Sequence, residues 1–235
     1  MPVPYFYFAH LANMKDEFAL NESSSRHVVQ VLRMQSGEKL RLTDGRGVKV
    51  LAKIHEANKK KCVVQIVEKQ IQERPVRSIS IALSLLKNAS RFEWFLEKSA
   101  ELGVSEIIPL KTARTEKQQF RMDRMNNILE SALIQSQQVW MPVLHEPQHF
   151  NSWIEKAQAD RKLIAHCESG KKNKLSEITE TISSSVLILI GPEGDFTNEE
   201  IQLAIAHQFA AVELGENRLR SETAAITAAA VLKLC

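Results

Sequence analysis

The sequence is poor in cysteine and has no long apolar run. Its three cysteines, Cys62, Cys167 and Cys235, are widely spaced and form no CxxC pair, so a disulfide framework is not expected. No apolar stretch is long enough to span a membrane, and the segment Met1-Pro-Val-Pro-Tyr5 lacks the basic and apolar regions of a secretory signal. These absences predict a cytoplasmic protein with reduced thiols and no membrane contact.

Signatures of common cofactor and metal sites are also missing. The chain has neither a GxGxxG stretch after a strand nor GxxxxGK followed by Ser or Thr, which argues against Rossmann-type dinucleotide binding and P-loop nucleotide binding. His145-Glu-Pro-Gln-His149 matches the HExxH pattern of zinc proteases. That pattern needs both histidines one turn apart on a continuous helix, and Pro147 interrupts such a helix. The sequence therefore predicts no metal site.

Positive charge is concentrated near the N-terminus. Residues 1–74 carry 13 Lys and Arg against 8 Asp and Glu, whereas residues 75–235 carry 18 against 20. A basic module of this kind favours binding to a polyanion, because Lys and Arg contacts to phosphates supply most of the non-specific affinity for nucleic acid. An ordinary solvated basic face explains the same surplus equally well.

The N-terminal part has the pattern of a small β domain. Residues 39–43 and 47–54 alternate apolar and polar side chains on either side of Asp44-Gly-Arg-Gly47, which is a hairpin signal. Residues 62–67 add a further strand. The polar residues 70–77 are typical of a link between domains. We expect a small barrel followed by a second domain.

Beyond Pro75, strands alternate with helices. Strands are expected at residues 79–86, 104–110, 162–166 and 186–190 and around Val143, and helices at residues 91–102, 121–138 and 152–159. This alternation predicts an α/β domain with a mostly parallel sheet. The Ala-rich helix expected at residues 224–234 is suited to close packing against the core or against a second subunit.

Two segments near the C-terminus combine glycine with polar side chains. They are Leu189-Ile-Gly-Pro-Glu-Gly-Asp-Phe196 and Leu214-Gly-Glu-Asn-Arg-Leu-Arg-Ser-Glu-Thr-Ala224, and each follows an apolar run and leads into a helix. The first of these helices is expected to begin at Thr197, with Glu200 completing a capping box. Because open α/β sheets bind ligands at the carboxyl ends of their strands, both segments predict a ligand site.

The amino-acid sequences of these two segments resemble motifs of the ribosomal small subunit methyltransferase E family. GPEG followed by LG and LRxETA is similar to the C-terminal motifs of that family. Residues 26–33, RHVVQVLR, with Leu42-Thr-Asp-Gly45 after them, resemble its HHxxxVLR and DG pattern. Residues 98–109, KSAELGVSEIIP, resemble its KxxELGVxxIxP stretch. The matches occur in the same order and extend over the whole chain.

The resemblance implies a fold, an activity and partners. It implies a PUA-like RNA-binding domain at residues 1–72 and a SPOUT methyltransferase domain at residues 73–235, in which the chain forms a trefoil knot around bound S-adenosylmethionine and dimerises. The implied reaction is methylation of N3 of a specific uridine in 16S rRNA, either naked or within the assembled small ribosomal subunit. The alternatives are a non-catalytic RNA-binding ribosome assembly factor of the same fold and a related enzyme that modifies another base.

Under this resemblance, the two segments and a third loop at residues 166–170 hold the cofactor. The expected cofactor-binding residues are His166, Leu189, Ile190, Gly191, Pro192, Glu193, Gly194, Leu214, Gly215, Asn217, Leu219, Arg220 and Thr223. They offer apolar walls, backbone groups and a hydroxyl to an adenosyl group. His166 is expected to be a packed loop histidine rather than a catalytic residue.

Arg220 is the candidate catalytic residue. N3 of uracil is a poor nucleophile while it is protonated, so catalysis needs a proton acceptor, a cation that stabilises the uracil anion, or both. Arg220 lies between the second segment and the helix after it, where it supplies that cation. The alternative is a salt bridge from Arg220 to Glu222 or Glu193. These two carboxylates are interpreted as acceptors for backbone N–H groups rather than as the base.

Candidate RNA contacts lie in two basic stretches. Arg26, His27 and Arg33 flank an apolar, helix-like stretch at residues 28–32. Lys111 and Arg114 belong to a basic loop, residues 111–124, which is expected beside the cleft. Both groups suit an RNA backbone, and ordinary solvated charge is the alternative for both.

The chain departs from the family pattern in three places. Asp195 replaces the last glycine of GPEGGF, Asn217 and Arg218 replace the Arg and Ile of LGxRILR, and residues 134–138, IQSQQ, replace EQSGR. The last change removes a glutamate and an arginine. We expect an intact cofactor site and rearranged substrate contacts.

Overall fold

The computed structural model describes residues 3–116, 119–178 and 184–234; Lys117 and Cys235 lie outside them. The chain divides into two compact units, Met1–Arg74 with Leu133–Met141, and Pro75–Ala132 with Pro142–Cys235. The domain boundary between residues 72 and 73 stays a prediction. Nothing in the sequence indicated that residues 133–141 belong with the N-terminal residues.

The first unit contains a five-stranded sheet in the order β1-β3-β4-β5-β2. The strands are β1 (Tyr5–Tyr7), β2 (Glu17–Ala19), β3 (Lys39–Thr43), β4 (Val48–Glu56) and β5 (Val63–Ile71). The predicted hairpin is confirmed, because β3 and β4 pair antiparallel across residues 44–47. Alternate side chains of β3 and β4 are fully buried in one apolar core, which explains the period-two pattern of these strands.

The stretch at residues 28–32 is helical over most of its length, as expected, but its turn is π-helical. A short helix, α1 (Glu22–Arg26), is followed by one π-helical turn, His27–Val31. Val28 is buried, whereas the side chains of Val31 and Leu32 are exposed by 67% and 41%. The apolar residues therefore do not share one buried face, because the wider turn rotates the later ones toward solvent.

Residues 137–141 pack against the β3–β4 hairpin of the same unit. The Gly47 N–H donates to the carbonyl of Val139 at 2.8 Å, and the Met141 N–H donates to the carbonyl of Gly45 at 2.9 Å. These bonds join segments that are far apart in the sequence. They explain why residues 133–141 belong to the first unit.

Gly47 is the position where this packing leaves no room for a side chain. Its φ is +97°, and a Cβ would lie 2.5 Å from Trp140 Cζ2 and 2.7 Å from the carbonyl oxygen of Gln72. We expect Gly47→Ala to lower the free energy of unfolding by about 3 kcal/mol or more, since a left-handed backbone and a steric clash add. Gly37→Ala is the control, because Gly37 has φ +95° but only Lys53 Cε nearby, at 3.8 Å.

The Gly37 variant should lose only about 1–2 kcal/mol, the cost of the backbone conformation alone. Urea denaturation followed by circular dichroism measures both values. Equal losses in the two variants would contradict the role of the contact with residues 137–141.

The second unit contains an eight-stranded sheet in which every pairing is parallel. The order is β11-β13-β10-β12-β6-β7-β8, and β9 also pairs with β7. The strands are β6 (Ser78–Ser84), β7 (Glu106–Lys111), β8 (Val143–Leu144), β9 (Gln148–His149), β10 (Arg161–Ala165), β11 (Asn173–Lys174), β12 (Ser185–Ile190) and β13 (Ala210–Glu213). The predicted α/β fold with a mostly parallel sheet is confirmed. The trefoil knot stays a prediction.

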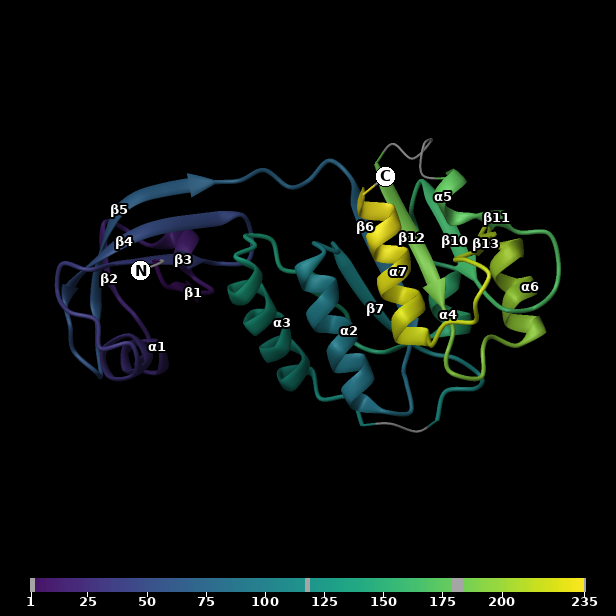
Figure 1. Cartoon of the computed structure of the whole chain (residues 1–235), viewed down its shortest axis with the longest axis horizontal. Helices are drawn as coiled ribbons and strands as arrows, with labels where there is room; N and C mark the ends of the chain where they lie inside the picture. The colour runs from purple at the N-terminus through teal and green to yellow at the C-terminus, as the bar shows by residue number, and fades with distance from the viewer. Residues whose placement is uncertain (1–2, 117–118, 179–183, 235) are drawn as a thin grey trace. The chain divides into compact units, whose positions relative to one another are not determined.

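Helices cover both faces of this sheet (Figure 1). The helices of this unit are α2 (Ala89–Glu101), α4 (Phe150–Ile154), α5 (Leu175–Ile178), α6 (Asn198–Ala206) and α7 (Ser221–Leu234). α3 (Met122–Ser136) is divided between the two units. α4 and α6 pack on Leu187 and Leu189 of β12, whereas α7 contacts α2, β6 and β12. Because both faces are covered, β12 is a continuous apolar run with no polar alternation.

The helix and strand boundaries test the predicted start of α6 and the conformation of residues 145–149. Thr197 caps α6, and Glu200 completes the capping box as predicted. Residues 145–149 are not helical and end in strand β9, so the two histidines do not lie one turn apart on a helix. Within residues 3–116, 119–178 and 184–234, no cluster of His, Cys, Asp and Glu is arranged to hold a metal ion. No helix in this same part of the chain is long and apolar enough to cross a membrane.

Candidate functional site

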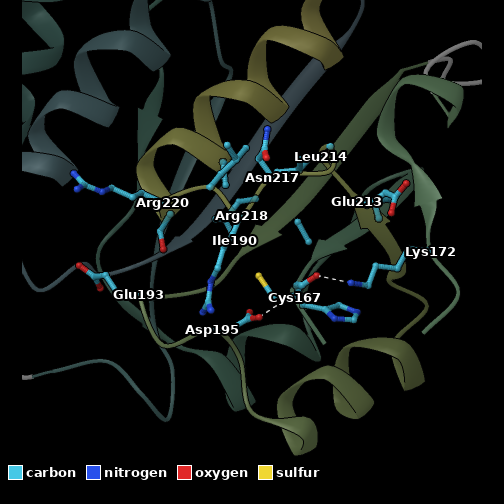
Figure 2. A pocket seen from close by; sticks show the side chains of 18 of the residues that line it. Cys167, Lys172, Ile190, Glu193, Asp195, Glu213, Leu214, Asn217, Arg218 and Arg220 are labelled. Atoms are coloured by element: carbon cyan, nitrogen blue, oxygen red, sulfur yellow. Dashed lines mark hydrogen bonds between the residues drawn. The ribbon is translucent and has the colours of Figure 1, made fainter. Parts of the chain in front are cut away.

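Three neighbouring parallel strands, β10, β12 and β13, end at one cavity of about 730 Å³. A volume of this size suits a small-molecule cofactor. The lining comes from the loops that follow the strands and from the start of α7 (Figure 2). The lining residues are Ala165, His166, Cys167, Lys172, Ile190, Gly191, Pro192, Glu193, Asp195, Val212, Glu213, Leu214, Gly215, Glu216, Asn217, Arg218, Leu219, Arg220, Ser221 and Ala224.

The loop after β12 is tightly folded at Gly191. A Cβ on Gly191 would lie 3.1 Å from the Phe196 N and 3.2 Å from Asp195 Oδ1, closer than most real contacts. The guanidinium of Arg114, from the loop after β7, donates to the carbonyls of Gly194 and Phe196. The loop is therefore tightly packed around Gly191 and is also bound by the guanidinium of Arg114, which comes from a different loop.

Asp195 ties the loop after β12 to the loop after β10. Its φ is +64°, a conformation that glycine adopts without strain and that Asp and Asn tolerate better than most residues. Its Oδ2 accepts the Cys167 N–H at 2.6 Å, and its Oδ1 accepts the Phe196 N–H at 2.8 Å. Asp195, which departs from the family pattern, thus links the loop after β10 to the loop after β12, and these loops form two walls of the cavity.

Cys167 is a wall residue rather than a nucleophile. Burial raises the pKa of its thiol, and the carboxylate of Asp195 adds to that rise, while Arg218 opposes it. A thiol with a raised pKa holds little thiolate at neutral pH. Figure 2 shows the Arg218 side chain on the side of Cys167 and Asp195, whereas the Arg220 side chain points away from them.

The carboxylates near Arg220 have other partners. Arg91, from α2, places its Nε 3.6 Å from Glu222 Oε1 and its NH1 3.9 Å from Glu193 Oε1. Glu193 also accepts the backbone N–H of Lys87 at 3.1 Å. The described residues provide no ion pair for Arg220, so the expected alternative, a salt bridge to Glu222 or Glu193, is not found. Arg91 is the cation that pairs with both carboxylates, and the guanidinium of Arg220 is left available to a ligand.

His166 lies in the cavity wall with no hydrogen bond to its ring. Both ring nitrogens are buried, and neither has a partner among the residues that the structure describes. Burial lowers the pKa of His166 below its usual value of 6.5, and Lys172, whose Nζ donates to the His166 carbonyl at 2.7 Å, lowers it further. His166 is therefore neutral at neutral pH, with one nitrogen that can donate and one that can accept.

The lowered pKa of His166 gives a pH dependence with a definite sign. As pH falls through 6.5, the unfolded chain takes up a proton on this residue while the folded chain resists it, so stability is lost on acidification. We expect the urea midpoint to fall less between pH 7 and pH 5 in His166→Phe than in the wild type. An equal fall in both proteins would contradict this assignment.

The cavity fits S-adenosylmethionine as the expected cofactor. The two ring nitrogens of His166 are buried and have no hydrogen-bond partner among the described residues. A polar ligand in the cavity would supply the missing partner. Ile190, Leu214 and Leu219 supply apolar surface beside these nitrogens, and Gly215, at φ +141°, exposes its backbone. Backbone groups at strand ends, apolar walls and a few polar atoms are the pattern of an adenosyl pocket.

Most of the expected cofactor residues line this one cavity. Leu189, Gly194 and Thr223 do not: Leu189 is buried in the core on the other face of β12, and Gly194 and Thr223 are exposed. Cys167, Lys172 and Asp195 also line the cavity and were not among the predicted cofactor-binding residues, although Cys167 and Asp195 lie in two of the loops expected to hold the cofactor. No sequence motif predicted a role for Lys172, because its place at the cavity depends on the hydrogen bond that its Nζ donates to the His166 carbonyl.

The candidate RNA residues are exposed but differ in their contacts. Arg26 pairs with Glu22 at 2.6 Å, and the His27 ring lies edge-on to Phe6 at a centroid distance of 5.6 Å. Arg33 is exposed with φ +55°, and Lys111 is exposed at the end of β7. Arg114 is exposed, yet its guanidinium is bound to the Gly194 loop.

The basic loop at residues 111–124 is less basic than its composition suggests. Arg124 forms a two-bond ion pair with Glu93 of α2, at 2.5 and 2.9 Å. The Arg124 guanidinium lowers the pKa of the Glu93 carboxyl. Part of the expected charge is thus used within the protein, and Lys117 lies outside the described residues.

Comparison with known proteins gives consistent matches along the chain. Residues 72–233 match the family described as an RNA methyltransferase domain, and residues 20–67 match the RNA methyltransferase PUA domain. The Ribosomal RNA small subunit methyltransferase E of Rickettsia conorii is 28% identical over 94% of this chain and 91% of its own length.

Two solved structures are similar over almost the whole chain. A probable rRNA-methyltransferase of Porphyromonas gingivalis is 35% identical, with a TM-score of 0.90 and 99% of each chain covered. The Ribosomal RNA small subunit methyltransferase E of Neisseria gonorrhoeae, bound to S-adenosyl methionine, is 28% identical, with a TM-score of 0.87 and 98% of this chain and 96% of its own covered.

Proposed function

Because the chain belongs to the ribosomal RNA small subunit methyltransferase E family, we propose that it methylates N3 of a specific uridine in 16S rRNA. It is an S-adenosylmethionine-dependent rRNA methyltransferase with an N-terminal PUA domain. The observation that carries the proposal is the cavity at the carboxyl ends of β10, β12 and β13, with Arg220 at its edge. The cofactor-binding and RNA-binding roles given above are part of this proposal.

The proposed reaction requires the protein to position the uracil and the methyl donor rather than to form a covalent bond to either of them. S-adenosylmethionine, when bound, supplies an activated methyl group on a sulfonium. The residues around the cavity must hold the uracil in line with that group and lower the cost of removing its N3 proton.

In this proposal, Arg220 stabilises the negative charge that develops on the uracil. Its carbonyl accepts the Ala224 N–H at 2.7 Å, so it stands directly before the first turn of α7. The free N–H groups of that turn carry a partial positive charge and add to the effect of the guanidinium. Glu222 is buried beside Arg91, which suits a group that orients Arg91 rather than one exchanging protons with substrate.

Mass mapping of rRNA tests the reaction and the base. In a strain that lacks this protein, one uridine-containing fragment of 16S rRNA should be lighter by one methyl group. The purified protein with S-adenosylmethionine should restore that mass, on either the naked rRNA or the small subunit. The proposal is wrong if no fragment changes mass, and a change on another base would favour the related-enzyme alternative.

Calorimetry separates the enzyme from a non-catalytic assembly factor. An enzyme binds S-adenosylmethionine in the absence of RNA, whereas a factor that has lost activity has no need of this affinity. The cavity and the partnerless ring of His166 favour the enzyme.

The proposal includes a homodimer that works in the cytoplasm, where ribosomal subunits are assembled. Light scattering of the purified protein should give twice the chain mass of 26.6 kDa. A monomer mass would contradict the dimer and leave the assignment of the reaction to the mapping experiment.

A further inference from the structure

One face of the N-terminal sheet carries a group of cations that the proposed reaction does not use. Strand register places Lys39 of β3 directly opposite Lys53 of β4, and Arg41 and Lys49 follow on the same face. We call these four residues the β3–β4 basic face. The side chains between them point the other way, into the buried core of the unit.

Charge on this face is divided between the strands. The acids on the same face are Glu68, opposite Leu51, and Glu17, opposite Gln65, and they belong to β5 and β2. Glu68 accepts a hydrogen bond from Gln70 at 2.6 Å. The cations are thus gathered on two central strands, with the acids set to one side.

None of the four cations is neutralised within the described part of the chain. No ion pair joins Lys39, Arg41, Lys49 or Lys53 to a carboxylate there. Lys49 lies 5.9 Å from the centroid of the Tyr5 ring, a cation–π contact that leaves its charge in place. Like charges directly opposite on a sheet are destabilising, so the Lys39–Lys53 pair is a cost to the free protein.

We propose that the β3–β4 basic face is a docking surface for the phosphate backbone of the rRNA substrate. The inference rests on the proposed function, since it names where that RNA is held by the N-terminal unit. The Cβ atoms of Lys39 and Lys53 lie about 5 Å apart across the strands, and positions two residues apart along one strand, such as Lys39 and Arg41, are separated by about 7 Å. This spacing offers several contacts to consecutive phosphates. A polyanion also removes the repulsion between Lys39 and Lys53.

RNA fits this surface better than an anionic membrane does. Membrane-binding surfaces add exposed apolar side chains to their cations, whereas Leu51 is the only apolar side chain of β3 and β4 on this face and is half-buried. The surface is also distinct from Arg26, His27 and Arg33, which come from α1 and the turn after it.

Salt-dependent RNA binding tests the proposal. The probe is labelled 16S rRNA transcribed in vitro, with binding measured over a series of KCl concentrations. Lys39→Gln/Lys53→Gln should bind about tenfold more weakly, with a salt slope smaller by about 1 for each lysine removed. Its affinity for S-adenosylmethionine alone should be unchanged, and its melting temperature should be equal or higher because a repulsion is removed.

Lys15→Gln/Lys156→Gln is the matched control, since it removes two exposed lysines that lie outside this face. Equal affinity and salt slope in the two double variants would overturn the proposal even if the wild type methylates rRNA. Loss of binding to phosphatidylserine vesicles with unchanged RNA binding would overturn it too. A wild type that binds the transcript but transfers no methyl group would contradict the proposed reaction and leave the surface supported.

Discussion

Arg220→Gln is expected to lower kcat for rRNA methylation by about two to three orders of magnitude, the usual loss when one group that stabilises a developing anion is removed. Arg220 also lines the cofactor cavity, so the dissociation constant of S-adenosylmethionine should rise too, but by a smaller factor, because the Arg220 side chain points away from Cys167 and Asp195 (Figure 2). Single-turnover methylation with the cofactor in excess measures the chemical step.

Arg218→Gln is the matched control for Arg220. It removes the same charge from the same loop, and both side chains line the cavity. We expect Arg218→Gln to retain most of kcat, and Arg220→Lys to recover part of it because the charge remains while the planar fork is lost. Equal losses of kcat in Arg218→Gln and Arg220→Gln would remove the reason for assigning catalysis to Arg220.

The second large effect is expected at Asp195. Asp195→Val should weaken S-adenosylmethionine binding by at least about tenfold and lower the free energy of unfolding by about 2–4 kcal/mol, since a β-branched residue at φ +64° is strongly strained. The variant also loses the bond to the Cys167 N–H, so two walls of the cavity are no longer tied. Calorimetry and urea denaturation measure the two effects.

Asp195→Gly separates backbone strain from the lost hydrogen bonds. Glycine adopts the positive φ without cost, so this variant should lose only about 1 kcal/mol and bind the cofactor within a few-fold of wild type. If the glycine variant loses as much affinity as the valine variant, the carboxylate rather than the backbone conformation controls the site.

Gln137 shows the same relation between a departure from the family pattern and the backbone. It stands where the resembling motif, EQSGR, has glycine, and its φ is +55°. The backbone at Asp195 and at Gln137 thus keeps the conformation that favours glycine, although the side chain has changed. The sequence showed that these positions were unusual, and only the structure showed that the conformation was retained.

Local features were predictable because neighbours in the sequence decide them. The β12 strand, the cap at Thr197 with Glu200 and the β3–β4 hairpin each depend on residues within a few positions of one another. Strand β13 was missed, because four residues with little alternation carry too weak a signal.

Contacts between distant segments could not be predicted. Nothing in the sequence pairs Arg91 with Glu222 and Glu193, or Arg124 with Glu93, since the partners lie on different elements. The charge count of residues 111–124 therefore overstated the cations available to RNA. Residues 137–141 joined the N-terminal unit for the same reason, through hydrogen bonds to Gly45 and Gly47.

The family, the parallel α/β sheet and the two loops that form most of the cavity were all predictable from the amino-acid sequence alone. The order of the motifs shows the family, and hydrophobic periodicity predicts the sheet. The two loops follow from the rule that ligands bind at the carboxyl ends of parallel strands. The three-dimensional fold sets which charges are free: Arg91 pairs with the two carboxylates expected as partners of Arg220, and strand register gathers Lys39, Arg41, Lys49 and Lys53 on one face. Electrostatic partners depend on distances in space, and distances in space are set by packing.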